Sequence, residues 1–242
     1  MRNIIKYTTA AAALAFLTAC GGGGGGGGGV AGVDPQGIWT GPTSTGYTAS
    51  TVVLETGETW GIYSSGTTIY GALYGNTTTN GSAVTITGTD FNFLTNSSTP
   101  GTLTGSIVAK SSMSLSGNNV KVPLTYSNSY DATPTAATGT WSFVGRSRSY
   151  SLIPGTITID NAGRFTLNQT NCVTSGTIVA RPGGKNVYNV TLSAVGQGCA
   201  IGQSSTAGVA YIDTTVTPNK LLSLALTPDR TDGIIVIGTK SM

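Results

Sequence analysis

Residues 156–160 read Thr156-Ile157-Thr158-Ile159-Asp160, in which apolar and polar side chains alternate strictly. Because successive side chains of a strand point to opposite faces of the sheet, this pattern predicts a strand with one buried and one wet face. The same alternation occurs at 83–87 (AVTIT). Residues 233–237 (GIIVI) are apolar throughout, so we expect that strand to be covered on both faces.

Similar short segments fill most of the chain and are bounded by Gly, Asn, Asp, Ser or Pro. The sequence holds 36 Gly and 41 Thr, and we find no convincing amphipathic helix beyond its first twenty residues. Threonine favours strands through its β-branched side chain, and glycine favours turns. We expect nine strands between residues 37 and 126, with separate strands at 83–88 and 91–94, and eight between 139 and 238. The predicted fold class is all-β, with two small antiparallel β-barrel or sandwich units.

A weak internal repeat, which we call an echo, predicts where the two units begin. GIWT at 37–40 recurs as GTWS at 139–142, which is 102 positions later. A second echo, 105–110 (GSIVAK) against 176–181 (GTIVAR), is out of register with the first. We therefore expect a first β unit at 37–127, a linker at 128–138 and a second β unit at 139–242. Coincidence in a chain this rich in Gly and Thr remains an alternative explanation.

The first twenty residues have the pattern of an export signal. Arg2 and Lys6 precede an apolar run at 10–17, which is too short to cross a hydrocarbon core that needs about 20 residues. The run ends in Leu17-Thr18-Ala19-Cys20, which resembles the lipobox of bacterial lipoproteins. The resemblance implies a signal peptide at 1–19, cut before Cys20, and palmitate-type acylation of that cysteine. Acyl chains, at about 0.8 kcal/mol per buried CH₂, would then hold the protein to a membrane.

Residues 20–36 are expected to be a tether between the anchor and the folded part. An unbroken run of glycine occupies 21–29, and such a run is too flexible to pack a core. Gly21, rather than aspartate, follows the cysteine. In the Gram-negative sorting rule of these lipoproteins, this implies the outer membrane. The sequence leaves open whether the protein faces the surface or the periplasm.

Two cysteines remain if Cys20 carries lipid. Cys172 and Cys199 form an even pair in an oxidising compartment, which predicts a disulfide, although two buried free thiols are the alternative. The chain has no histidine and no Cys-x-x-Cys pair, so we expect no metal site and no cofactor. The densest oxygen cluster, at 229–233 (DRTDG), is better explained as a turn.

We expect no enzymatic activity and no catalytic residues. The absence of histidine excludes a Ser-His-Asp or Cys-His set. Glu55 and Glu58 flank Gly57 in what reads as a hairpin turn, where solvated acids are more common than a catalytic pair. Residues 20–109 contain four acids and no Lys or Arg, and the remainder is basic, but no dense Lys/Arg cluster with interleaved aromatics predicts nucleic-acid binding.

Gly-x-Trp at 37–39 resembles the first strand of lipocalin-like barrels, in which the tryptophan plugs one end and an arginine from the last strand covers it. Arg230 would take that part here. The lipidated cysteine, glycine-rich leader and β units together resemble the tandem-barrel surface lipoproteins of Gram-negative bacteria, such as the transferrin-binding and factor-H-binding types. We carry over no binding residues from them. The set of Trp60, Tyr63, Tyr70 and Tyr74 is expected either to pack a core or to line a groove.

Together these patterns predict a non-catalytic binding module on a lipid anchor. Its partner would be a host protein, a component of the envelope or a small apolar ligand, and the ligand-binding residues stay unknown at this level. The alternative is a structural or assembly factor of the cell envelope.

Overall fold

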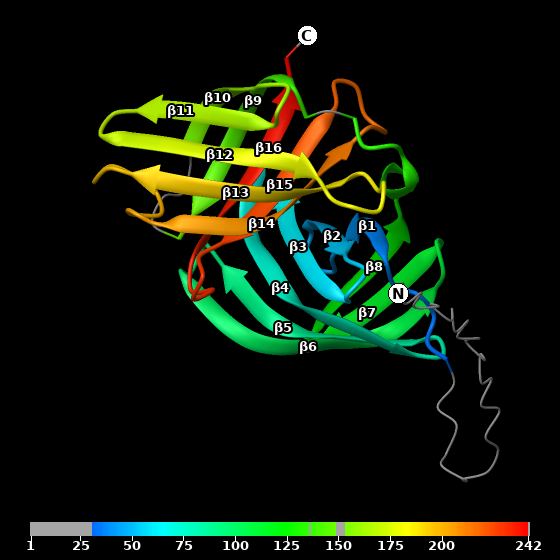
Figure 1. Cartoon of the computed structure of the whole chain (residues 1–242). Helices are drawn as coiled ribbons and strands as arrows, with labels where there is room; N and C mark the ends of the chain where they lie inside the picture. Colours follow the sequence, from blue (N-terminus) through cyan, green and yellow to red (C-terminus); the bar gives the residue numbers. More distant parts are fainter. Residues whose placement is uncertain (1–30, 136, 149–152, 242) are drawn as a thin grey trace, which may run out of the picture.

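The computed structural model describes residues 31–135, 137–148 and 153–241. Its strands form two antiparallel units stacked on one another (Figure 1), which confirms the predicted all-β class. The first unit contains β1 (Gly37–Pro42), β2 (Thr48–Val53), β3 (Glu58–Ser65), β4 (Thr68–Asn80), β5 (Ala83–Asn92), β6 (Ser97–Val108), β7 (Ser112–Gly117) and β8 (Val120–Tyr126). The second contains β9 (Gly139–Ser147), β10 (Ile153–Ile159), β11 (Arg164–Gln169), β12 (Cys172–Ala180), β13 (Val187–Val195), β14 (Ser205–Asp213), β15 (Lys220–Leu226) and β16 (Gly233–Lys240).

The predicted signal peptide at 1–19, Cys20 and the glycine run lie outside the described residues. Within the described part of the chain, no helix is long and apolar enough to cross a membrane.

The first unit is a closed barrel in which each strand pairs with its neighbours in sequence. Closure comes from β1, whose Trp39 and Thr40 pair with Tyr126 and Thr125 of β8. Because closure leaves no free strand edge, the backbone hydrogen bonds of these eight strands are used within the barrel.

The second unit follows the same up-and-down path. Its strand order is β10-β9-β16-β15-β14-β13-β12-β11, so β9 pairs with both β10 and β16 as β1 pairs with β2 and β8. Among the described residues no ladder joins β10 to β11, which leaves this barrel-like sheet with one open seam.

The two tryptophans of the internal echo occupy equivalent places. Trp39 and Trp141 lie in the first strand of their units, and neither is exposed. Each indole Nε1 donates to the carbonyl four residues earlier, that of Pro35 at 3.0 Å and that of Ala137 at 2.8 Å. The two copies of the second echo begin in β6 and β12, which hold different places in the two units. Only the first echo therefore marks equivalent positions.

One predicted boundary in the first barrel is wrong. We expected separate strands at 83–88 and 91–94, but a single strand, β5, runs through Gly88. Gly88 lies opposite Gly75 on one side and Gly101 on the other. A Cβ at Gly88 would lie 2.3 Å from the carbonyl oxygen of Tyr74, so this glycine permits a close approach of strands and does not end one.

The outer faces of β14, β15 and β16 pack against the first barrel. Tyr211, Leu224 and Ile235 join the same buried cluster as residues of the first unit. Ile234 and Val236, on the other face of β16, pack against the core of the second unit. This confirms that the apolar segment 233–237 is covered on both faces.

A buried arginine crosses the contact between the barrels. Arg146 of β9 donates through Nη1 to the carbonyl of Ile69 at 2.6 Å and through Nη2 to that of Phe93 at 2.8 Å. Hydrogen bonds from a charged donor are directional and about twice as strong as neutral ones. These contacts therefore fix the position of the second unit on the ends of β4 and β5.

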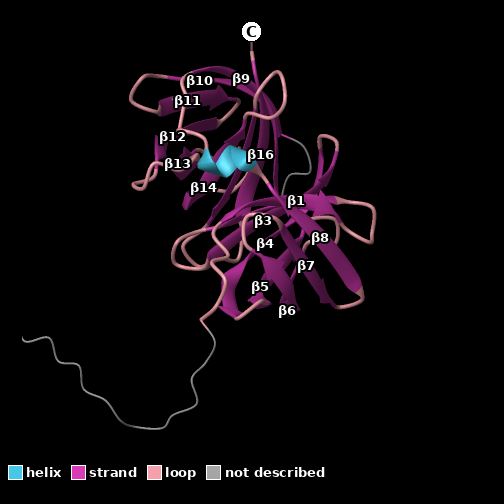
Figure 2. Cartoon of the chain, turned by 90° about the vertical axis from the view of Figure 1, so that its right-hand side faces the viewer, coloured by secondary structure: helices cyan, strands magenta, loops and turns pink. Residues whose placement is uncertain are grey.

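The segment between the barrels is anchored to both. It contains a short 3-10 helix, η1 (Asn128–Asp131), drawn in cyan near the junction of the units in Figure 2. Asp131 accepts hydrogen bonds from Lys110 of the first unit at 2.9 Å and Lys185 of the second at 2.6 Å. Lys185 and Lys110 hold the pKa of Asp131 well below its usual range, so its carboxylate stays charged between the two units.

Candidate functional site

The first barrel encloses a cavity of about 320 Å³. This volume is within the range of small-molecule pockets, about 300–1,000 Å³. Seven of the eight strands contribute aliphatic side chains to its wall: Ala49, Ile62, Leu73, Ile86, Leu103, Leu115, Val120, Val122 and Leu124. A pocket in the interior of the second unit, lined by Phe143, Phe165 and Ile178 among others, has a volume of only about 60 Å³.

Strand alternation places these side chains inside. In β8, Val122 and Leu124 are buried and line the cavity, while Pro123 between them and Lys121 and Thr125 beside them are exposed. In β7, Leu115 is buried between exposed serines. The apolar face of each short strand thus becomes the wall, and the polar face becomes the outer surface.

Trp39 closes one end of this barrel. It pairs directly with Thr51, which lines the cavity, so its indole is on the inner face. The ring of Tyr126 packs edge-on against it with 5.2 Å between centroids. Burial and the neighbouring Asp131 raise the pKa of Tyr126, so its phenol stays protonated.

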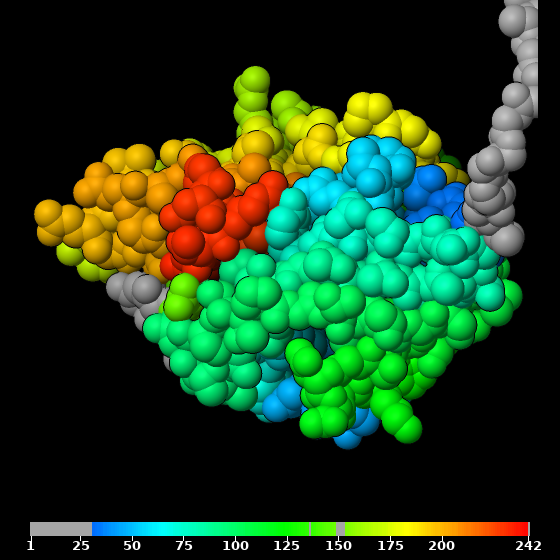
Figure 3. Space-filling view, turned by 90° about the horizontal axis from the view of Figure 1, so that it is seen from below, coloured from blue at the N-terminus to red at the C-terminus, as the bar shows by residue number. Residues whose placement is uncertain are grey.

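The other end of the barrel is open. The turn between β1 and β2 contributes Thr43, Thr45 and Tyr47, and the turn between β7 and β8 contributes Asn118. Tyr47 stacks on Tyr70 with a centroid distance of 4.4 Å. Figure 3 shows the molecule from below, where its surface is hollowed among the green segments of the first barrel.

A carboxyl group and a phenol lie together on the cavity wall. The hydroxyl of Tyr63 donates to Oδ1 of Asp90 at 2.9 Å and to the carbonyl of Phe91 at 3.2 Å. Burial raises the pKa of Asp90, and the hydrogen bond from Tyr63 opposes that change. A Cβ at Gly71 would lie 2.1 Å from the Tyr63 hydroxyl, so glycine there makes room for the pair.

Asp90 is the one charged side chain among the described residues of the wall, which also carries neutral polar groups such as Thr51, Asn92 and Thr102. In the described part of the chain no Lys or Arg forms a salt bridge with it. Among the described residues that line the cavity it is the one acid, so the wall offers no second carboxylate for acid–base catalysis. Its oxygens can exchange hydrogen bonds with a ligand inside the barrel.

The cysteine pair predicted from the sequence forms a disulfide. Cys172 and Cys199 are bonded, with 4.9 Å between their Cα atoms and a sequence separation of 27 positions. Both are buried in a small cluster with Ala194 and Ile201, away from the first barrel. The bond fastens the loop after β13 to the start of β12.

The glutamates near Gly57 point to different partners. Glu55 pairs with Arg181, and Glu58 accepts a hydrogen bond from the Tyr74 hydroxyl at 2.9 Å. The Asp229 turn is closed by Thr227 and Thr231, which donate to its carboxylate at 2.6 and 2.8 Å. Within residues 31–135, 137–148 and 153–241, no three His, Cys, Asp or Glu side chains gather as metal ligands would.

The four aromatic residues singled out in the sequence, Trp60, Tyr63, Tyr70 and Tyr74, do not form one site. Trp60 and Tyr74 pack edge-on at 4.6 Å between the barrels, Tyr63 lines the cavity and Tyr70 stacks at its mouth. The expected position of Arg230 is also wrong. Its guanidinium lies 3.9 Å from the ring centroid of Tyr74, because the turn before β16 ends beside β4 and not near Trp39.

The second unit does have a cation over its tryptophan. Lys240, at the end of the last strand, lies 5.6 Å from the ring centroid of Trp141. Sequence reasoning missed Asp90, Tyr47 and Asn118, because nothing in their local sequence shows that they face a common space.

No family model, no curated protein and no solved structure matches the chain. Its function therefore has to be argued from the residues themselves.

Proposed function

We propose that the protein is a lipid-anchored lipoprotein of the outer membrane whose first barrel binds a small apolar ligand without transforming it. The observation that carries this proposal is the 320 Å³ cavity, which has an aliphatic wall, one closed end and one open end. An eight-stranded barrel is wide enough to hold one small ligand.

The cavity also limits the chemistry of the ligand. Moving apolar surface from water into this wall contributes about 25 cal/mol per Å². Asp90 and Tyr63 offer hydrogen bonds at one place on the wall, so a ligand with a single hydroxyl or amine group fits better than a hydrocarbon. A buried polar group is best tolerated when it is hydrogen-bonded, which gives the pair its selectivity.

Filling the cavity tests the binding proposal. Ala49→Phe adds a ring to the buried wall and is expected to weaken binding of the neutral dye N-phenylnaphthylamine by about tenfold or more, or about 1.4 kcal/mol. Fluorescence titration of the chain without residues 1–29 measures this. Ala109→Phe is the matched control, because the same ring is then added to an exposed turn of the same barrel. Equal affinity in both variants would place the dye elsewhere and contradict the proposal.

The anchor rests on the sequence at 17–20 and has its own test. Cys20→Ala is expected to abolish incorporation of labelled palmitate and to leave the signal peptide uncut, because the acylated thiol is gone. Labelling of cells followed by electrophoresis of the protein measures both effects. Cys172→Ser is the control and should keep the label. Label that persists in Cys20→Ala would remove the lipoprotein assignment.

A further inference from the structure

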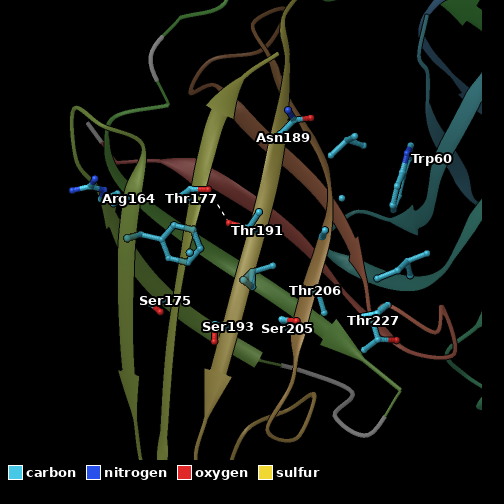
Figure 4. Close-up of a pocket in the computed structure, with 18 of the residues that line it drawn as sticks. Trp60, Arg164, Ser175, Thr177, Asn189, Thr191, Ser193, Ser205, Thr206 and Thr227 are labelled. Atoms are coloured by element: carbon cyan, nitrogen blue, oxygen red, sulfur yellow. Dashed lines mark hydrogen bonds between the residues drawn. The ribbon is translucent and has the colours of Figure 1, made fainter. Parts of the chain in front are cut away.

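A second hollow lies outside both barrels, where the second unit meets the first. It is a groove of about 910 Å³. Its floor is the outer face of β11 to β14, and Trp60 of β3 stands on the other side (Figure 4). Glu58 of the same strand also lines the groove. It shares no lining residue with the cavity of the first barrel.

The floor carries a row of hydroxyl groups that crosses four strands. Thr166, Ser175, Ser193 and Ser205 are direct neighbours in the register of β11, β12, β13 and β14. All four are exposed. Since neighbouring strands are about 4.8 Å apart, the row extends for roughly 14 Å.

A second row runs beside it. Arg164, Thr177 and Thr191 are neighbours in the next register position, and the two threonine hydroxyls lie 2.8 Å apart. Figure 4 marks this contact with a dashed line. The two rows are about 6.6 Å apart, which is two residues along a strand. The floor thus presents donors and acceptors in a regular grid, with threonine methyl groups between them.

The groove has an excess of positive charge. Arg164, Arg181 and Arg230 line it, with Glu58 as the acid among its lining residues. Arg181 is paired with Glu55, whereas in the described part of the chain Arg164 and Arg230 form no salt bridge. The ring of Tyr74 holds Arg230 in place, so this charge is available without much further ordering.

Trp60 adds its ring to the wall. Its side chain lines the groove and is only 6% exposed. Its Nε1 is buried and has no hydrogen-bond partner among the described residues. Because that nitrogen has almost no accessible surface, Trp60 offers a ligand in the groove apolar contact and no hydrogen bond.

These features select one class of ligand. A peptide strand cannot pair over the hydroxyl rows, because β12 and β13 are paired on both sides and the free strand edge of the floor lies at β11. Single-stranded nucleic acid is recognised mainly by stacking on exposed rings, and Trp60 is buried. A polyhydroxylated chain with carboxylate groups can use the hydroxyl rows, the methyl groups and the two unpaired arginines together. We propose that the groove between the barrels binds an acidic oligosaccharide.

Calorimetric titration of the full-length protein in non-ionic detergent tests this with three probes. A galacturonic acid hexamer is expected to bind, and to bind more weakly as salt increases. A glucose hexamer of the same length should bind at least tenfold more weakly, because it lacks the charge. Equal binding of the two would overturn the assignment, and so would equal binding of a single-stranded DNA hexamer.

Two double variants separate the charge from the hydroxyl rows. Arg164→Gln with Arg230→Gln is expected to weaken binding of the acidic hexamer about tenfold and to flatten its salt dependence. Ser175→Ala with Ser193→Ala should weaken both hexamers, because the hydroxyl contacts are shared. The matched control is Lys121→Gln with Lys220→Gln, which removes two exposed charges outside the groove.

Each variant is first compared with the parent protein by its unfolding midpoint, so that loss of the fold is recognised. Affinity that is unchanged in both groove variants would overturn the proposal, as would an equal loss in the lysine control. Because the Ala49→Phe variant leaves the groove intact, it should bind the acidic hexamer normally even though its barrel cavity is filled.

Discussion

Replacing Trp39 with alanine is expected to lower the free energy of unfolding by about 3–5 kcal/mol, as for other fully buried large side chains. The indole has no exposed surface, packs on Tyr126 and hydrogen-bonds to the Pro35 carbonyl, so the change opens a void at the closed end of the barrel. Urea denaturation followed by circular dichroism measures the loss. The dye affinity should fall as well, because the cavity loses its closed end.

Trp39→Phe separates packing from hydrogen bonding. The phenyl ring keeps much of the contact with Tyr126 but cannot donate to Pro35, so we expect a smaller loss of about 1–2 kcal/mol. Trp141→Ala should resemble Trp39→Ala, since both indoles are buried and bonded in the same way. A loss below about 1 kcal/mol in Trp39→Ala would show that this tryptophan does not close the barrel.

Removal of the disulfide has the second largest expected effect. Cys172→Ala with Cys199→Ala opens a loop of 27 residues, which the chain-entropy relation converts to about 3.5 kcal/mol. The loop joins β12 to the end of β13, next to the open seam of the second unit.

Unfolding in urea with and without reductant provides the measurement. The parent protein should lose the same amount of stability in reductant, and the double variant should not respond to it. The first barrel should keep its affinity for the dye in both cases. A double variant as stable as the parent would mean that the loop is held by its other contacts alone.

The buried faces of single strands follow from the sequence, whereas the partners of those faces do not. Alternation at 83–87 and 156–160 identified inward residues such as Ile86 and Ile157. The break that we expected after Gly88 concealed Asp90, which has the same parity as Val84 and Ile86. Continuing the alternation through the glycine would have placed this carboxyl on the inner face.

The ligand sites depend on contacts between distant segments, which local patterns do not encode. Tyr63 and Asp90 are 27 residues apart and meet because β4 lies between their strands. The groove depends on β3 facing β11 to β14, which are about a hundred residues later in the chain. Arg230 was assigned to the wrong ring for the same reason.

By itself, the sequence determined the all-β class, the two equivalent tryptophans and the disulfide pair, because these depend on side-chain period, on a local repeat and on cysteine number. Tertiary structure decided that one barrel is hollow and the other nearly filled. Phe143, Phe165 and Tyr188 pack inside the second unit, while Ala49, Thr51 and Gly61 leave space in the first. Whether a barrel has room for a ligand depends on the total volume of the side chains that point into it. Barrel closure decides which side chains those are, so the total is fixed only once the strands have paired.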